Sequence, residues 1–144
     1  MATSADTAAQ VWGGEWHMPT KAQMQELTAN TTYEWTTING VNGGKFTATN
    51  GNSIFLPAAG RWYNGSQASV DSYGYYWSST PYNSDNAYYL DFNNGSKNVY
   101  YYGYKRGCSI RPVIEPGPVY IFATSSNLQS LEARVAALEA YHTT

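Results

Sequence analysis

The sequence has few charged residues and almost no cysteine. Only 12% of its 144 residues are charged, and the net charge is −2. The eight Lys and Arg are scattered from Lys21 to Arg134, whereas nucleic-acid-binding proteins gather them in a patch. We therefore expect no nucleic-acid partner. Cys108 is the only cysteine, which excludes a disulfide within the chain.

Long apolar segments are also missing. No apolar run approaches the roughly 20 residues that a membrane-spanning helix needs, so we expect no membrane insertion. The start of the chain, Met1–Asp6, has neither a basic region nor an apolar stretch and does not look like a signal peptide. A chain of this length can bury a core without disulfides, and we expect one domain with a short appendage.

Residues for catalysis and metal binding are sparse as well. The two histidines, His17 and His142, do not combine with Cys108 into a metal-ligand spacing. No nucleophile with a base and an acid can be recognised in the sequence. We expect no metal, no cofactor and no enzymatic activity, with His17 structural and Cys108 a buried, inert thiol.

Tyrosine, in contrast, is abundant. Eleven of the fourteen tyrosines lie between Tyr63 and Tyr104, interleaved with Asn, Ser, Gly and Asp. A tyrosine provides a large rigid ring and a hydroxyl at a small cost in side-chain entropy, and the short polar residues provide adaptable hydrogen bonds. Aromatic residues with few charges are typical of the centre of binding interfaces. The composition therefore favours a binding protein.

Local patterns predict one helix followed by strands. The helix lies in Met18–Leu27, where Thr20 and Gln23 have the spacing of a capping box, and it should end near Asn30. The strands and the long stretches between them predict a small twisted antiparallel sheet with much irregular structure. The predicted strands are Lys45–Thr49, Ser53–Leu56, Tyr75–Thr80, Ala87–Phe92, Lys97–Tyr102 and Cys108–Val113.

Changes in composition divide the chain into four segments. We expect a flexible N-terminus at 1–10, a ligand-binding domain at 11–115, a linker with a short strand at 116–126 and a helix at 127–144. Apolar residues of that helix are spaced as in a coiled coil, which favours a homo-oligomer, with a trimer preferred. Two heptads are short, so packing of this helix on its own domain stays open. The apolar residues are Leu128, Leu131, Val135 and Leu138.

Several motifs rich in Trp, Gly and Pro occur in order between residues 11 and 113. They are Trp12–Lys21, Glu34–Gly43, Asn50–Gly60, Tyr76–Pro81 and Gly107–Val113. In this order they resemble the Fibrobacter succinogenes major paralogous domain, a C-type-lectin-like family abundant in gut bacteria and their phages. The resemblance implies an α+β, C-type-lectin-like fold with one or two helices and long loops. The calcium-binding motifs of sugar-binding C-type lectins are absent from the sequence.

Some members of this family are variable proteins of diversity-generating retroelements. In these proteins, reverse-transcription errors at template adenines rewrite the codons of exposed residues near the end of the domain. The resemblance implies that Tyr82–Cys108 is such a segment, with its densest variation in Asn98–Gly107. We expect Tyr76, Tyr88 and the five tryptophans to belong to the core instead. The expected ligand-binding residues are Asn64, Tyr73, Tyr82, Asn83, Asp85, Asn86, Tyr100, Tyr101, Tyr102, Tyr104 and Lys105.

The expected function is therefore ligand recognition by a Tyr/Asn/Ser-rich surface. The partner would be a protein or glycan on a cell surface, and the protein would sit on a virion tail fibre or a bacterial cell surface. The alternative is a structural stalk or fimbrial-type subunit whose aromatic residues pack against neighbouring subunits. Removal of residues 119–144 separates these hypotheses, because only the structural subunit should still associate.

Overall fold

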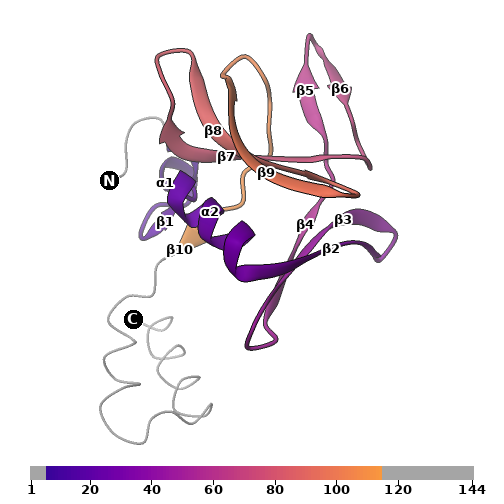
Figure 1. The fold of residues 1–144 in the computed structure, drawn as a ribbon. Coiled ribbons are helices and arrows are strands. Elements are labelled where there is room, and N and C mark those ends of the chain that lie inside the picture. The colour runs from indigo at the N-terminus through magenta and orange to yellow at the C-terminus, as the bar shows by residue number, and fades with distance from the viewer. Residues whose placement is uncertain (1–5, 115–144) are drawn as a thin grey trace, which may run out of the picture. The chain divides into compact units, whose positions relative to one another are not determined.

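The computed structural model describes residues 6–114, and Figure 1 draws the residues on either side as a thin grey trace. The chain divides into two compact units, Met1–Val113 and Ile114–Thr144, and the fold below is that of the first unit. The expected linker at 116–126 and helix at 127–144 lie outside the described residues. So do the expected oligomerisation residues Leu128, Leu131, Val135 and Leu138.

Strands dominate the described part of the chain. About half of it, 53%, is strand and 15% is helix, and the strands form several small antiparallel sheets. The expected α+β class is therefore wrong, and the fold is mostly β. In chain order the elements are α1 (Thr7–Trp12), β1 (Trp16–His17), α2 (Lys21–Asn30), β2 (Thr31–Ile38), β3 (Val41–Ala48), β4 (Ser53–Pro57), β5 (Arg61–Tyr63), β6 (Ser66–Ala68), β7 (Gly74–Pro81), β8 (Asn86–Asn93), β9 (Ser96–Gly103) and β10 (Val113–Ile114).

Tight turns replace the long loops that the sequence suggested. Asn39-Gly40 joins β2 to β3, and Asn64-Gly65 joins β5 to β6. All four of these residues have positive φ, as a two-residue hairpin turn requires. Segments that were expected to be irregular are therefore the paired strands of short hairpins.

The helix α2 confirms the predicted capping box. The Thr20 hydroxyl accepts a hydrogen bond from the Gln23 backbone N–H at 3.2 Å, and the Gln23 side chain accepts one from the Thr20 N–H at 2.9 Å. The helix ends at Asn30, also as predicted, and β2 begins at the next residue, Thr31. These reciprocal bonds satisfy two backbone donors that the first turn of a helix leaves open.

The helix α1 overlaps the segment 1–10 that we expected to be flexible. Asp6 is buried and caps this helix, because one carboxylate oxygen accepts a hydrogen bond from the Ala9 N–H at 3.0 Å. Both carboxylate oxygens also lie 3.2 Å from the Met18 nitrogen. A single carboxylate therefore holds α1 against the segment that leads into α2.

Replacing Asp6 with alanine should lower the free energy of unfolding by about 1–2 kcal/mol, because the helix loses its cap. The buried Met18 N–H would also lose its partner. Urea denaturation followed by circular dichroism measures the effect. The exposed neighbour Thr7 provides the control, since Thr7→Ala should change little. Equal losses in the two variants would contradict the role of Asp6.

The core lies between α2 and two three-stranded antiparallel sheets, β2-β3-β4 and β7-β8-β9. Figure 1 shows α2 running directly into β2 beside the β7-β8-β9 sheet. Leu90 and Phe92 point into this core from alternate positions of β8, as the sequence pattern predicted, whereas Tyr88 on the same side is only half-buried. The buried core residues are Met24, Phe46, Leu56, Tyr76, Leu90 and Phe92.

The opposite face of the β7-β8-β9 sheet carries a second aromatic layer. Tyr75 and Trp77 of β7 are paired with Asp91 and Tyr89 of β8, so these residues share the face that points away from α2. Tyr75 and Tyr89 are buried, with ring centroids 6.0 Å apart. Tyr102 of β9 meets Tyr89 edge-to-face at 5.5 Å and continues the layer toward the surface. This layer supports the site described below.

The strand predicted for Cys108–Val113 is wrong. Only β10, at its far end, pairs with another strand, which is β1. Ser109 instead exchanges backbone hydrogen bonds with Tyr75 and Trp77, at 2.8 and 2.9 Å, and Gly107 exchanges two with Trp62. The segment therefore runs as isolated bridges that connect β5 to the edge of β7, and Pro112, which has no N–H, cannot extend them.

The expectation that all five tryptophans lie in the core is also wrong. Trp12 and Trp62 are 55% and 54% exposed, and Trp16 is exposed as well. Trp62 belongs to the two-stranded β5–β6 hairpin, and a hairpin of this size has no second layer on its outer face. Trp35 packs against the core and Trp77 is half-buried in the second aromatic layer.

Candidate functional site

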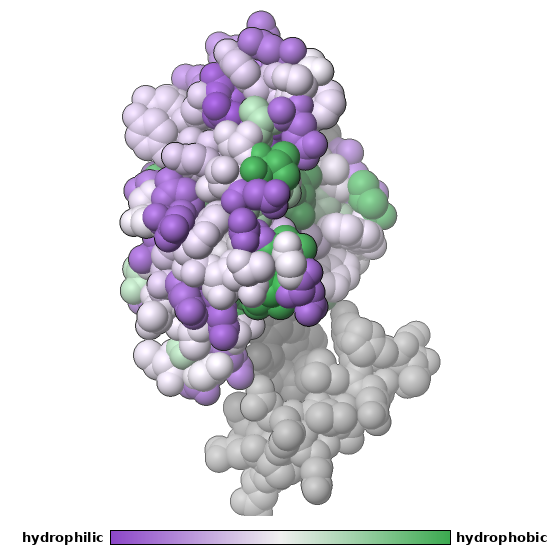
Figure 2. All heavy atoms as spheres, turned by 90° about the vertical axis from the view of Figure 1, so that its right-hand side faces the viewer, coloured by the Kyte–Doolittle hydropathy of each residue, from purple (hydrophilic) through white to green (hydrophobic). Residues whose placement is uncertain are grey.

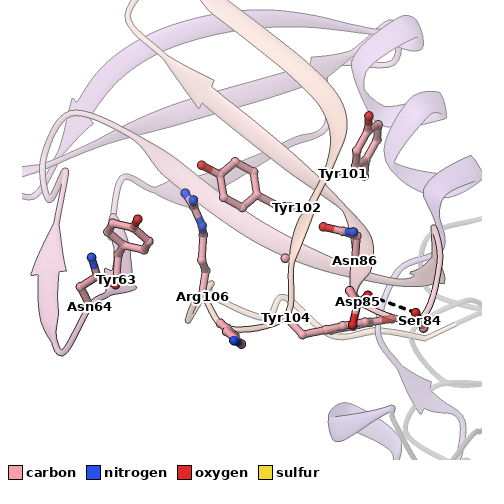
Figure 3. A pocket seen from close by; sticks show the side chains of 11 residues that line it. Tyr63, Asn64, Ser84, Asp85, Asn86, Tyr101, Tyr102, Tyr104 and Arg106 are labelled. Carbon is pink, nitrogen blue, oxygen red and sulfur yellow. Dashed lines mark hydrogen bonds between the residues drawn. The ribbon is translucent and has the colours of Figure 1, made fainter.

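An open hollow of about 840 Å³ lies where three turns approach one another. One wall is the β5–β6 turn, the second is the β7–β8 turn, and the third is β9 with the turn that follows it. Figure 3 shows the side chains from these segments arranged around the hollow. The lining residues are Tyr63, Asn64, Ser84, Asp85, Asn86, Tyr101, Tyr102, Gly103, Tyr104, Lys105 and Arg106.

Most of the residues expected to bind ligand line this hollow. They are Asn64, Asp85, Asn86, Tyr101, Tyr102, Tyr104 and Lys105. Tyr82, Asn83 and Tyr100 lie outside its lining, as does Tyr73. Tyr63, Ser84, Gly103 and Arg106 line the hollow but were not among the expected ligand-binding residues. Ser84, Gly103 and Arg106 lie within the variable segment expected at Tyr82–Cys108, and Tyr63 precedes the Asn64-Gly65 dipeptide that predicts a hairpin turn.

Asn83 fixes the conformation of the β7–β8 turn. Its side-chain oxygen accepts hydrogen bonds from the Asp85 N–H and from the Asn86 amide, each at 2.9 Å. The turn is closed by the Tyr82 N–H, which donates to the Asn86 carbonyl at 2.9 Å. Asn83 therefore acts on the site through the placement of Asp85 and Asn86, although it does not line the hollow.

Tyr104 connects the second wall of the hollow to the third. Its backbone N–H donates to the Asp85 carbonyl at 3.0 Å. Its ring is half-exposed and lies with its centroid 6.2 Å from that of Trp77 in the second aromatic layer. The β7–β8 turn and the turn after β9 are therefore joined by a backbone hydrogen bond, and the ring of Trp77 supports Tyr104. The rim of the hollow is thus formed in the absence of a ligand.

A stack of tyrosines extends from the edge of the sheet. Tyr101 is nearly parallel to Tyr82, with centroids 3.8 Å apart, and it also stacks on Tyr100 at 4.7 Å. Adjacent residues of a strand point to opposite faces, so Tyr100 and Tyr101 meet around the unpaired edge of β9. Hydrogen bonding to Tyr100 and Tyr82 raises the pKa of Tyr101 to about 12. The three rings thus hold one another in place.

Two arginines lie against the rings of Tyr63 and Tyr102, which line the hollow. The Cζ of Arg106 is 3.4 Å from the ring centroid of Tyr102 and 4.4 Å from that of Tyr63. Figure 3 shows the Arg106 side chain standing between these two rings. The Cζ of Arg61 lies over the same two rings at 5.5 and 5.6 Å, and over Tyr75 at 5.0 Å. Both cations are therefore attracted to ring faces.

Cys108 lies near these arginines, in a partly buried position. Burial raises the pKa of its thiol to about 12, even though the charges of Arg61 and Arg106 act in the opposite direction. The thiolate is the reactive form of cysteine, so the thiol should be inert at neutral pH.

Native protein should react with iodoacetamide at pH 8 roughly a thousandfold more slowly than an ordinary thiol, because the thiolate fraction falls with the rise in pKa. Mass spectrometry of the labelled protein over time gives the rate. A cysteine introduced at exposed Thr49 supplies the fast reference, and protein unfolded in guanidinium should label at Cys108 without this delay. Similar labelling rates in native protein at Cys108 and at the cysteine of the Thr49→Cys variant would contradict the burial of the Cys108 thiol.

A family model described as a domain of unknown function (DUF8237) matches residues 30–113, more than half of the chain. The chain belongs to the DUF8237 family. The matched DUF8237 region contains all three walls of the hollow and both core sheets, but α1 and most of α2 precede it. Comparison with curated proteins and with solved structures found no significant match.

Two further features of the DUF8237 protein bear on its chemistry. In residues 6–114, no three or more His, Cys, Asp or Glu side chains gather where they could hold a metal ion. Neither helix in that range has the length and apolar character needed to cross a membrane. The side chains that line the hollow carry aromatic rings, amides, hydroxyls and a few charges.

Proposed function

We propose that this protein is a ligand-recognition domain whose hollow binds a protein or glycan on a cell surface. The observation that carries the proposal is the convergence of three turns, distant in sequence, on one hollow lined with Tyr, Asn and Arg. Tyr and Arg are enriched at the residues that dominate binding energy. Rings that are already held by stacking lose little entropy when a ligand arrives.

The surface composition supports the same proposal. On the face that Figure 2 displays, strongly hydrophobic residues form a few separate patches among residues of neutral or polar character. Exposed rings with hydroxyl or indole N–H groups can contact both apolar and polar parts of a ligand. The lining residues also stand on turns and an edge strand, away from the core around Phe92. Their side chains can therefore change without loss of the core.

This separation of surface from core suits a variable protein of a diversity-generating retroelement, which we propose on the motif resemblance given above. The display would be multivalent, on a phage tail fibre or a bacterial surface, through an oligomer formed by 127–144. Multivalent display can raise the apparent affinity by about 10²–10⁴ where geometry allows. A near-copy of the codons for Tyr82–Val113 in adjacent DNA, differing where the copy has adenine, would support the variable-protein proposal.

The direct test of the proposed function is a binding assay with the full chain. Fluorescently labelled protein is applied to a panel of bacterial cells and to a glycan array, and bound fluorescence is measured against a variant with the hollow altered by Tyr101→Ala. Binding by the native chain that this variant loses supports the proposal. Binding by both chains alike, or by neither, would reject it. Stable association of the chain without 119–144 would favour the structural-subunit alternative.

A further inference from the structure

We propose that the hollow recognises an acidic oligosaccharide, a sugar chain that carries carboxylate or sulfate groups, and that Arg106 binds the acidic group. The inference rests on the proposed function, because it names the ligand class of the same site. It is carried by the unpaired guanidinium of Arg106, the aromatic rings and the short polar side chains that line one hollow, and by the unpaired guanidinium of Arg61 over two of the same rings.

The guanidinium groups of Arg61 and Arg106 have unused hydrogen-bond donors. In the described part of the chain, neither Arg61 nor Arg106 forms an ion pair or a side-chain hydrogen bond, and the Nε of Arg61 is buried without a partner. A guanidinium carries five N–H donors in a planar fork that suits a carboxylate or sulfate. The attraction between a guanidinium and a ring does not use a hydrogen-bond donor, so these donors stay available to a ligand.

The hollow carries more positive than negative charge. Lys105 and Arg106 line it, and Arg61 stands over the same rings as Arg106. Asp85 is the one acidic residue in the lining. The hollow is therefore locally positive on a chain whose net charge is −2. Two guanidinium groups over the same pair of rings repel each other, and a bound anion would relieve that repulsion.

The other lining residues favour a sugar chain over an acidic peptide. The C–H face of a sugar ring is apolar and packs flat on an aromatic ring, and the exposed residues Tyr63 and Tyr104 carry such rings in the lining of the hollow. Asn64, Ser84 and Asn86 supply short donors and acceptors for hydroxyl groups. An extended peptide would instead need the unpaired edge of β9, where the rings of Tyr100 and Tyr101 meet.

The test uses the full chain and matched probes in isothermal titration calorimetry. The carboxylate probe is an oligogalacturonate, with its methyl ester as the uncharged equivalent. The sulfate probe is a heparin oligosaccharide of similar length, and hexaglutamate represents an acidic peptide. We expect at least one acidic oligosaccharide to bind and the methyl ester not to bind. Binding should weaken with salt, because the screening length falls from about 10 Å at 0.1 M to about 3 Å at 1 M.

Arg106→Gln should weaken that binding roughly 10- to 100-fold, since a hydrogen-bonded charge is lost. Arg106→Lys should recover only part of it, because lysine has no planar fork. Lys105→Gln, at an exposed residue with no ring contact, should also weaken binding without unfolding the chain. Arg111→Gln is the matched control, because it removes one positive charge at an exposed residue outside the hollow and should have no effect.

Several results would overturn the inference: no binding of either acidic oligosaccharide, equal binding of the methyl ester, equal binding of hexaglutamate, or equal effects of Arg106→Gln and Arg111→Gln. The failure of the proposed function is a different result. If the cell panel shows binding that depends on Tyr101 while acidic and neutral glycans compete equally, the function stands and the acidic ligand falls. If no cell or glycan binds, both fall.

Discussion

Replacing Phe92 with alanine should lower the free energy of unfolding by about 3–5 kcal/mol, the largest stability loss we expect from a single substitution in this protein. Phe92 is fully buried, with 0% of its surface exposed. Its ring packs against those of Tyr33, Phe46 and Tyr76, with centroids 5.9 to 6.2 Å away. Truncation would leave a cavity where both sheets and α2 meet.

Urea denaturation followed by tryptophan fluorescence measures this loss. Phe55, on β4, is only half-buried and supplies the matched control, since Phe55→Ala removes the same ring from a less enclosed position. We expect a clearly smaller loss from Phe55→Ala. Equal losses would mean that the centre of the fold does not lie at Phe92.

Gly74 provides a second test of the same packing. A Cβ atom at this position would lie 2.1 Å from the Phe92 Cζ, so Gly74→Ala should cost about 1–3 kcal/mol through overpacking. In the Phe92→Ala background this cost should largely disappear, because the ring that would clash has gone. A double-mutant cycle measures the coupling, and simple additivity of the two changes would contradict direct contact.

The sequence predicted those parts of the fold that depend on local signals. The capping box of α2 and the strands on either side of 50–52 and 93–96 follow from residues a few positions apart, and the structure confirms them in α2, β3, β4, β8 and β9. The fold class did not follow in this way. The Asn-Gly dipeptides at Asn39 and Asn64 form the turns of two hairpins that the predicted strands do not include, so the predicted share of strand is too low.

The candidate site was harder to predict because its residues come from different sheets. The side chains of Tyr63 and Arg106 are adjacent only because Gly107 exchanges backbone hydrogen bonds with Trp62. No local pattern encodes a bridge between residues so far apart in sequence. The composition indicated that Tyr100–Tyr104 includes exposed rings, but Tyr102 is partly buried, since it lies between Arg106 and Tyr89. Density of tyrosine alone cannot separate these two roles.

Replacing Tyr101 with alanine should weaken ligand binding roughly 30-fold or more, the effect of losing a dominant aromatic residue at an interface. Tyr101 lines the hollow, and its ring is the middle member of the stack with Tyr82 and Tyr100. Its loss therefore removes one contact and also frees the two neighbouring rings. The thermal unfolding midpoint should change little, because the ring lies at the edge of the sheet and outside the core cluster.

Three variants make this prediction specific. Tyr101→Phe keeps the ring stack but removes the hydroxyl that forms hydrogen bonds with Tyr100 and Tyr82. This variant should retain most of the ligand affinity. Tyr73→Ala removes an exposed tyrosine outside the hollow and should bind normally. Tyr102→Ala should lose binding and stability together, because that ring supports both arginines and packs on Tyr89. Each variant is titrated with the cell or oligosaccharide of the panel that binds most tightly, and its melting curve is recorded. The affinities and the melting temperatures of the variants are then compared. If Tyr73→Ala lost as much affinity as Tyr101→Ala, the rings would be acting as a general sticky surface and the hollow would not be the site.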